Sequence, residues 1–403
     1  MAVTLGFAAA AWPAYGSQPP EQAAPAADPQ EDAEAATEPR LAERLLHERE
    51  ILGTSFRGHL FIDGLPLSPD GLQIGKALEL RRARLSFWRQ LPRRWEVLGS
   101  AELNSGQFEL KDLYTRRRFD RLGTLTVGNQ SEPMGLDELT SSLSIPLLEP
   151  SLPTALVPGR NFGVMLGNRH GYFQYQLGAF GSGTEQEGRR DIGAALTGRL
   201  THRWLGDGDN VRHLGIALSS RSVSGDEQFR SVPEIGIDQE FTVDTGIING
   251  ASRTRRVGLE YLQTFGRHAL QGEVIAAHVE RDAGTRLRFG GAYLQGTWTA
   301  WGEGPRYDEG DAVLARSPVA SPAHWGDAWG RGNLAFSIRL SRIDLSDDDI
   351  VGGSQMNLTL GATWDISART RLAANLVRLI DLSGPNAEAE GSTAIGVRFQ
   401  YAF

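Results

Sequence analysis

Short runs in which apolar and polar residues alternate fill most of the chain from Phe56 onward. The last run shows the pattern most clearly, because one face is apolar and the residues between are small or polar. Since successive side chains of a strand point to opposite faces, such a run predicts a β-strand with one apolar face. Aromatic residues at its end are typical of strands in membrane-spanning β-barrels. The apolar face of this last run carries Ile395, Val397, Phe399, Tyr401 and Phe403.

The connections between these runs alternate in length. Short ones at 168–170 and 266–267 alternate with long ones at 130–159, 223–251 and 300–331. Short turns at one end and long loops at the other are typical of bacterial outer-membrane barrels, which have an even number of strands. A soluble β-sandwich, with its polar face towards solvent, would alternate in the same way. The predicted strands are 56–63, 77–90, 94–104, 107–116, 122–129, 160–167, 171–180, 190–201, 211–222, 252–264, 268–280, 286–299, 332–344, 354–365, 370–381 and 393–403.

The sequence therefore predicts an all-β fold over residues 56–403, a transmembrane antiparallel β-barrel of about sixteen strands. Between 122–129 and 160–167 lie about thirty residues with little period-two pattern. A loop of that length within a compact domain is often functional. We interpret it as a third loop that folds into the barrel and narrows its lumen.

The N-terminal region has a different composition. Residues 1–16 are apolar with small residues near their end, as in a signal peptide, although no Lys or Arg precedes Arg40. An ordinary disordered N-terminus is the alternative. Residues 17–55 are interpreted as a flexible linker followed by a short periplasmic helix over 40–52, either a simple lead-in to the barrel or a small coiled coil.

Composition excludes several classes of function. The chain has no cysteine, and its 41 Lys and Arg against 49 Asp and Glu offer no support for nucleic-acid binding. Its eight histidines are scattered, and no motif of a metalloprotease, a serine hydrolase or a phosphate-binding loop is present. The acidic stretches at 207–210 and 347–349 lack the full calcium-loop pattern and are interpreted as turns. We therefore expect no enzyme activity, no metal and no cofactor.

Positive charge is carried almost wholly by arginine, since Lys76 and Lys111 are the two lysines. A genome rich in arginine codons would explain this as well as a need for guanidinium groups. If the apolar faces meet lipid, the opposite faces line the lumen, with Glu96, Glu102 and Glu260 as acidic counterparts. The arginines placed inward in this way are Arg82, Arg84, Arg199, Arg221, Arg256, Arg339 and Arg398.

Several stretches together resemble the phosphate-selective porin O and P family, over roughly 56–403. They are Gly58–Asp63, Glu79–Leu85, Leu110–Tyr114, Leu125–Pro133, Glu138–Leu139 within Asp137–Ser142, Pro158–Val164 and Val397–Phe403.

The resemblance implies a homotrimeric porin of the bacterial outer membrane, in contact with lipid and lipopolysaccharide. The C-terminal strand resembles the signal that the barrel assembly machinery recognises at Phe403. Family members pass anions along arginines, which implies that Arg81 and Arg160 join Arg82 and Arg84 in the pore. The third loop departs from this pattern, because Arg160 is its one basic residue and its acidic residues are Glu132, Asp137, Glu138 and Glu149.

These observations predict passive diffusion of small hydrophilic solutes, with a preference for phosphate-like or carboxylate anions. An acidic loop opposite an arginine wall would also suit a non-selective or cation-tolerant porin for polar and zwitterionic solutes. Alternatively, the arginines pair with glutamates and brace the wall. A non-conducting structural barrel and a membrane hydrolase built on a barrel are the remaining hypotheses.

Overall fold

The wall of the molecule is a single antiparallel sheet. The computed structural model describes residues 49–51, 53–67, 78–183, 193–208, 210–235, 241–282, 284, 286–322, 332–384 and 387–403. Within them, the wall strands are β2 (Thr54–Leu67), β3 (Leu78–Leu91), β4 (Trp95–Asn104), β5 (Gln107–Phe119), β6 (Gly123–Ser131), β7 (Arg160–His170), β8 (Phe173–Phe180), β9 (Ala195–Leu205), β10 (Val211–Glu227), β13 (Ile248–Phe265), β14 (His268–Arg281), β15 (Arg286–Trp301), β18 (Asn333–Asp347), β19 (Ile350–Asp365), β20 (Thr370–Ser383) and β21 (Thr393–Ala402).

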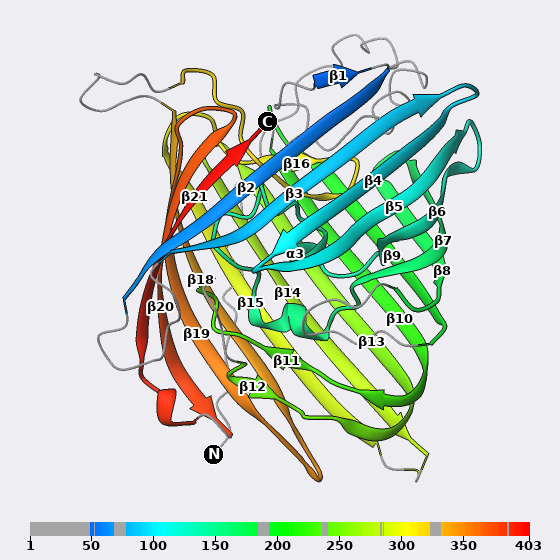
Figure 1. Cartoon of the computed structure of the whole chain (residues 1–403), viewed down its shortest axis with the longest axis vertical. Helices are drawn as coiled ribbons and strands as arrows, with labels where there is room; N and C mark the ends of the chain where they lie inside the picture. Colours follow the sequence, from blue (N-terminus) through cyan, green and yellow to red (C-terminus); the bar gives the residue numbers. More distant parts are fainter. Residues whose placement is uncertain are drawn as a thin grey trace, which may run out of the picture.

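These sixteen strands close into a barrel (Figure 1). Each wall strand pairs with the next along the chain, and β21 pairs back onto β2. At this closure the backbone of Gly58 exchanges hydrogen bonds of 2.8 and 2.9 Å with Phe403. The Phe403 ring lies over Gly58, where an added Cβ would be 2.3 Å from the ring. Glycine at this position therefore lets the C-terminal aromatic ring cover the seam.

All sixteen predicted strands are present, and the prediction of a transmembrane β-barrel is confirmed. The boundaries differ by a few residues. For example, β10 and β13 are longer than expected, so the connection predicted at 223–251 is the shorter 228–247. No helix among the described residues is long and apolar enough to cross a membrane.

The N-terminal predictions fall mostly outside the described residues. The signal peptide at 1–16 and the linker over 17–39 lie there entirely. Of the helix expected at 40–52, the described part is Arg49–Ile51, which forms the short strand β1 and pairs with the start of β2. The helix prediction is wrong for these three residues, because β2 offers their backbone groups hydrogen-bond partners that so short a helix could not supply.

The barrel has two unlike ends. One, which we call the turn end, carries short connections such as 120–122 and 171–172, together with Phe403. The other, the loop end, carries the third loop (132–159) and the fifth loop (228–247). The third loop folds into the barrel as predicted, and contains α3 (Leu136–Leu139) and the 3-10 helix η2 (Leu152–Leu156).

An apolar core lies inside the barrel, between the wall and these inserted segments. Met134 and Leu152 of the third loop pack with Phe229 of the fifth loop and with Ile275 and Ile343 of the wall. The fifth loop also contains the strands β11 (Arg230–Ser231) and β12 (Val243–Asp244), which pair with each other. The third and fifth loops therefore occupy part of the lumen.

A second insertion comes from the turn end, in the connection after β15, so the long connection predicted at 300–331 does not lie at the same end as the third and fifth loops. Strands β16 (Arg306–Asp308) and β17 (Val313–Ala315) form a small hairpin, which we call the inner hairpin. Its Val313 and Leu314 pack with Leu136 and Leu139 of the third loop. The two insertions thus meet inside the barrel. The remaining short element, the 3-10 helix η3 (Ala387–Ala389), lies between β20 and β21.

Candidate functional site

Two cavities inside the barrel adjoin each other beside strand β3. One, towards the turn end, is lined by Arg57, Trp88 and Arg116 among others. The second, towards the loop end, is lined by residues that include Arg81 and Arg230. Arg84 of β3 and Ser141 of the third loop line both cavities. The space between this wall strand and the third loop is therefore the candidate constriction.

Strand β3 presents three arginines to this region because its pairing with β2 is irregular. Phe61 pairs with Arg82, but the next residue, Ile62, pairs with Leu80, so Arg81 is an extra residue. Such a β-bulge re-aims a side chain that strict alternation would place on the other face. As a result, Arg81, Arg82 and Arg84 all line the cavity at the loop end.

Strand β5 has a matching bulge. Ser100 of β4 pairs with Asp112, while Ala101 pairs with Leu110, which leaves Lys111 as the extra residue. Lys111 and Asp112 consequently both line cavities, although they are adjacent in sequence. The two bulges lie on either side of β4 and concentrate charge on one wall.

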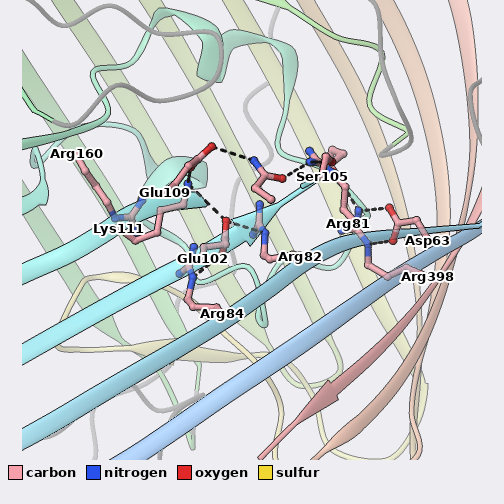
Figure 2. A network of polar contacts seen from close by, with 12 residues as sticks. Asp63, Arg81, Arg82, Arg84, Glu102, Ser105, Glu109, Lys111, Arg160 and Arg398 are labelled. Carbon is pink, nitrogen blue, oxygen red and sulfur yellow. Dashed lines mark hydrogen bonds and ion pairs between the residues drawn. The ribbon is translucent and has the colours of Figure 1, made fainter. Parts of the chain in front are cut away.

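Three cations converge on a single carboxylate of β4, as Figure 2 shows. Glu102 lies directly opposite Arg84 in register, and Arg84 Nε donates to its Oε2 at 2.7 Å. Arg82 Nε and Lys111 Nζ lie 3.3 and 3.5 Å from Glu102 Oε1. Lys111 Nζ also donates to Glu109. The Glu102 side chain is fully buried, so the cations cover it on the lumen side.

A second charged group joins the wall to the third loop (Figure 2). Arg398 of β21 makes two 2.6 Å hydrogen bonds to Asp63 and one of 2.7 Å to Glu149 of the third loop. Arg81 Nε lies 3.5 Å from the same Glu149 oxygen. Burial by itself would raise the pKa of Glu149, but the charges of Arg81 and Arg398 outweigh it and hold this pKa at about 2.

Arg160, at the end of the third loop, bridges to the wall as well. Its Nε donates to Asp112 at 3.0 Å, and its Nη1 lies 3.9 Å from Glu138. Both Arg160 and Glu138 line the cavity at the loop end.

The nine arginines expected to line the pore fall into two groups. Arg81, Arg82, Arg84 and Arg160 keep 11–19% of their side-chain surface exposed. The others keep 0–4% and are held by carboxylates, as the bracing hypothesis supposed. Their pairs are Arg199 with Glu260, Arg221 with Glu132, Arg256 with Glu227, Arg339 with Glu234, and Arg398 with Asp63 and Glu149.

The four acidic residues of the third loop also differ in environment. Glu132 is buried at the loop's base, where it accepts hydrogen bonds from Asn161 and Arg221. Asp137 is buried too, and accepts the Ser151 N–H at 2.7 Å. Burial raises the pKa of Asp137, against the opposing effect of Arg339. Glu138 and Glu149 keep 12% and 11% of their side chains exposed.

Two further carboxylates fix the third loop. Glu273 of β14 accepts the backbone N–H groups of Leu136 and Asp137 at 2.6 and 3.0 Å, at the start of α3. Glu234 of the fifth loop accepts the Leu152 N–H at 3.0 Å, at the start of η2. Because the first N–H groups of a helix have no partner within it, both carboxylates satisfy otherwise unpaired donors.

The inner hairpin is fixed to the wall in the same way. Arg199 donates to the backbone carbonyls of Asp311 and Ala312, at 2.7 and 2.8 Å. Glu309 accepts a hydrogen bond from Arg169 and forms an ion pair with Arg203. Burial alone would raise the pKa of Glu309, but the charges of Arg203 and Arg169 outweigh burial and lower this pKa.

Sequence reasoning missed several of these residues. Alternation along 107–116 could have placed Glu109 and Lys111 on the inner face, and along 268–280 it could have placed Glu273 there. The sequence predicts that three glutamates face the lumen as acidic counterparts of the arginines. Glu102 and Glu260 form the ion pairs described above, and Glu96 pairs with Arg116. Glu234 lies in a loop without periodicity, so no sequence signal marks it. In the described part of the chain, no group of three or more His, Asp or Glu residues could hold a metal ion.

A closed sixteen-stranded barrel with a loop folded into its lumen defines an outer-membrane porin. The model of the family described as "Phosphate-selective porin O and P" matches residues 55–403, and the chain belongs to this family. Its fold and family are those of a channel rather than an enzyme. No curated protein sequence matches the chain.

Solved porins share the fold at low sequence identity. The anion-selective porin from Comamonas acidovorans is 14% identical, with a TM-score of 0.52, over 87% of this chain and 99% of that one. OmpT of Vibrio cholerae, in a trimer form, is 12% identical with a TM-score of 0.52, over 87% and 99%. OmpF of Salmonella typhi, in complex with daunomycin, is 10% identical with a TM-score of 0.54, over 89% and 100%.

Proposed function

We propose that the channel passes small hydrophilic solutes and prefers anions, of the phosphate or carboxylate type. The observation that carries this proposal is the sharing of Glu102 by Arg82, Arg84 and Lys111. Since Lys111 also pairs with Glu109, these three cations face two carboxylates, which leaves one positive charge in excess on this wall. Because the Glu102 carboxylate is buried behind the arginines, a solute at the constriction meets guanidinium groups first.

The chemistry of arginine supports the same preference. Guanidinium groups present planar pairs of donors that suit carboxylate and phosphate oxygens. A permeating ion must gain enough from such contacts to lose part of its water, yet not so much that it stays bound. Arg82 and Arg84 meet both conditions, because each is engaged on one side by Glu102 and retains exposed surface on the other.

The test is a reversal potential in a planar bilayer with a salt gradient. We expect single-channel conductance steps and a potential of the sign that marks anion preference. A potential of the opposite sign would contradict the arginine-wall proposal while leaving the channel itself intact. Absence of conductance from correctly folded protein would favour a structural barrel instead.

A second candidate is a channel for polar or zwitterionic solutes with little ion preference. The observation in its favour is that Glu138 and Glu149 of the third loop line the same cavity as Arg81, Arg82 and Arg84. A transverse field between the two sides would orient a zwitterion. A reversal potential near zero, with uptake of neutral amino acids into protein-containing liposomes, would support this candidate.

We also propose that three copies of the chain assemble, and that the barrel assembly machinery recognises Phe403. The trimer form described for the Vibrio cholerae protein supports the first part. The exposed C-terminal aromatic ring supports the second. Cross-linking in native outer membranes should give a species of three chains. Phe403→Ala should lower the amount of folded protein in the membrane without lowering its synthesis.

A further inference from the structure

A group of arginines lies on the outer surface of the barrel, towards the loop end. These residues alternate with buried neighbours such as Thr254, Leu287 and Ile343, which places their side chains on the outward face of the wall. All of them are exposed. We call them the outer arginine patch: Arg253 and Arg255 of β13, Arg286 and Arg288 of β15, and Arg342 of β18.

The register of the strands brings four of these side chains together, while Arg342 pairs with Ala292, four residues further along β15 than Arg288. Arg255 pairs with His278 of β14, and His278 pairs in turn with Arg288. The neighbouring row consists of Arg253, Glu280 and Arg286. Side chains that are directly opposite in an antiparallel pair lie about 5 Å apart at Cβ. Two parallel rows therefore cross the outer face of β13, β14 and β15, each with an arginine at both ends and with His278 or Glu280 between them.

Positive charge exceeds negative charge in this patch. The carboxylates at this patch are Glu280, which accepts from Arg255 at 2.6 Å, Asp344, whose partner in the register is Gly290, and Asp347, which accepts the backbone N–H of Arg288 at 2.7 Å. Five arginines thus face three carboxylates. Among the described residues, none forms a hydrogen bond or ion pair with the guanidinium group of Arg288 or Arg342. These two groups are available to an anion from outside.

The patch begins where the apolar part of the outer wall ends. Nearer the middle of the wall, the outward residues next to Arg255 on β13 are Val257 and Leu259, and the one next to Arg342 on β18 is Leu340. At the opposite ends of the strands, the outward residues are aromatic: Phe265, Trp298, Phe336 and Trp364. An arginine that faces lipid is costly at mid-bilayer but not near the interface. The arginines therefore lie at headgroup level at the loop end.

We propose that the outer arginine patch binds the phosphate groups of lipopolysaccharide in the outer leaflet. Long loops lie on the extracellular side of outer-membrane barrels, so the loop end meets this leaflet. Paired arginine forks bind phosphate oxygens in bidentate geometry. The adjoining apolar surface, including Val257 and Leu340, is placed to contact the acyl chains of the same lipid.

The test compares lipid retention by the full-length protein and two matched variants. Each purified protein is mixed with diphosphoryl lipid A, and bound lipid is counted by native mass spectrometry after detergent exchange. Arg255→Gln with Arg288→Gln removes two charges from the patch. Arg89→Gln with Arg212→Gln removes two exposed, outward-facing arginines near the turn end and serves as control. Unchanged single-channel conductance verifies folding of both variants.

We expect the patch variant to retain lipid A about tenfold less than the unchanged protein, because each arginine contributes to headgroup attraction. The control variant should retain it normally, and dephosphorylated lipid A should bind weakly to all three proteins. Equal retention by the patch variant, or equal binding of the dephosphorylated lipid, would overturn the proposal. Displacement of the lipid by inorganic phosphate alone would reject the lipid in favour of a free anion. Loss of oligomer mass in the patch variant alone would identify the patch as a contact between copies.

Discussion

Arg84 of β3 and Glu102 of β4 lie opposite each other in register, with Arg84 Nε 2.7 Å from Glu102 Oε2. Arg84 and Glu102 do not form an isolated, neutral ion pair, because Arg82 and Lys111 approach the same carboxylate. Removing both arginines would leave Lys111 between Glu102 and Glu109, and the local charge would become negative. The excess charge of this wall, and with it the proposed anion preference, therefore depends on Arg82 and Arg84.

Neutralising these two arginines should weaken anion preference. For Arg82→Gln with Arg84→Gln, we expect the anion-to-cation permeability ratio to fall by about three- to tenfold, the effect of one or two unit charges near a hydrated ion. Oligomer stability should hardly change, since backbone pairing maintains the wall. The reversal potential measures the ratio, and Arg94→Gln, at an exposed turn, is the matched control. Loss of folded oligomer would instead favour a bracing role.

Neutralising the shared carboxylate should have the opposite effect. Glu102→Gln removes this negative charge and keeps a side chain of similar size, so Glu109 alone would compensate the three cations. We expect the anion-to-cation permeability ratio to rise by about threefold or more. The same reversal-potential measurement checks this. If the ratio fell, the charge of Glu102 would not be screened from the lumen by the arginines.

The sequence predicted the wall better than the constriction. Alternation located all sixteen strands and placed Arg82 and Arg84 on one face, since a regular strand repeats every two residues. It could not place Arg81, because a bulge interrupts the repeat at that residue. Nor could it identify Glu234, which is brought to Arg339 by loop packing across many residues of sequence. Loop packing depends on tertiary shape, which periodicity does not encode.

The bulge at Arg81 allows a deletion test. Deleting Arg81 should leave β3 in regular pairing with β2, with Arg82 and Arg84 still facing the lumen. We therefore expect the deletion and Arg81→Gln to lower the anion-to-cation permeability ratio by the same amount, about threefold or less. Deleting Ala83 instead should invert part of the strand, because a one-residue shift exchanges the two faces. Misfolding of the Arg81 deletion, measured by heat-dependent gel mobility, would show that the bulge is needed for the barrel.

The contacts of Glu149 should persist in acid. Its pKa is lowered to about 2, so it stays ionised in the folded channel until the pH approaches that value. Stabilisation from a lowered carboxyl pKa is present above the unfolded value and is lost as pH falls through the folded one. We expect the difference in conductance between the unchanged protein and Glu149→Gln to be constant from about pH 8 to 4 and to vanish near pH 2. A difference that disappears at about pH 4.5 would show that Arg81 and Arg398 do not hold the carboxylate.

Glu234 should determine how firmly the third loop is held. It is buried, and it accepts hydrogen bonds from Leu152 N at 3.0 Å and Thr359 Oγ1 at 2.6 Å, while Arg339 Nη2 lies 2.9 Å away. Removing one partner of a buried ion pair costs about 3–5 kcal/mol, because the other charge is left without compensation. For Glu234→Ala we therefore expect η2 to open locally while the wall remains folded.

Hydrogen exchange and current noise measure this opening. Amide exchange over residues 150–157 should speed up by about two orders of magnitude in Glu234→Ala, since about 3 kcal/mol of local protection is lost. The open-channel current should become noisier as the loop moves in the lumen. Glu309→Ala, which releases Arg169 and Arg203 from the inner hairpin, is the control and should leave exchange over 150–157 unchanged. Equal exchange in all three proteins would mean that apolar packing around Leu152 and Leu156, rather than Glu234, holds the loop in place.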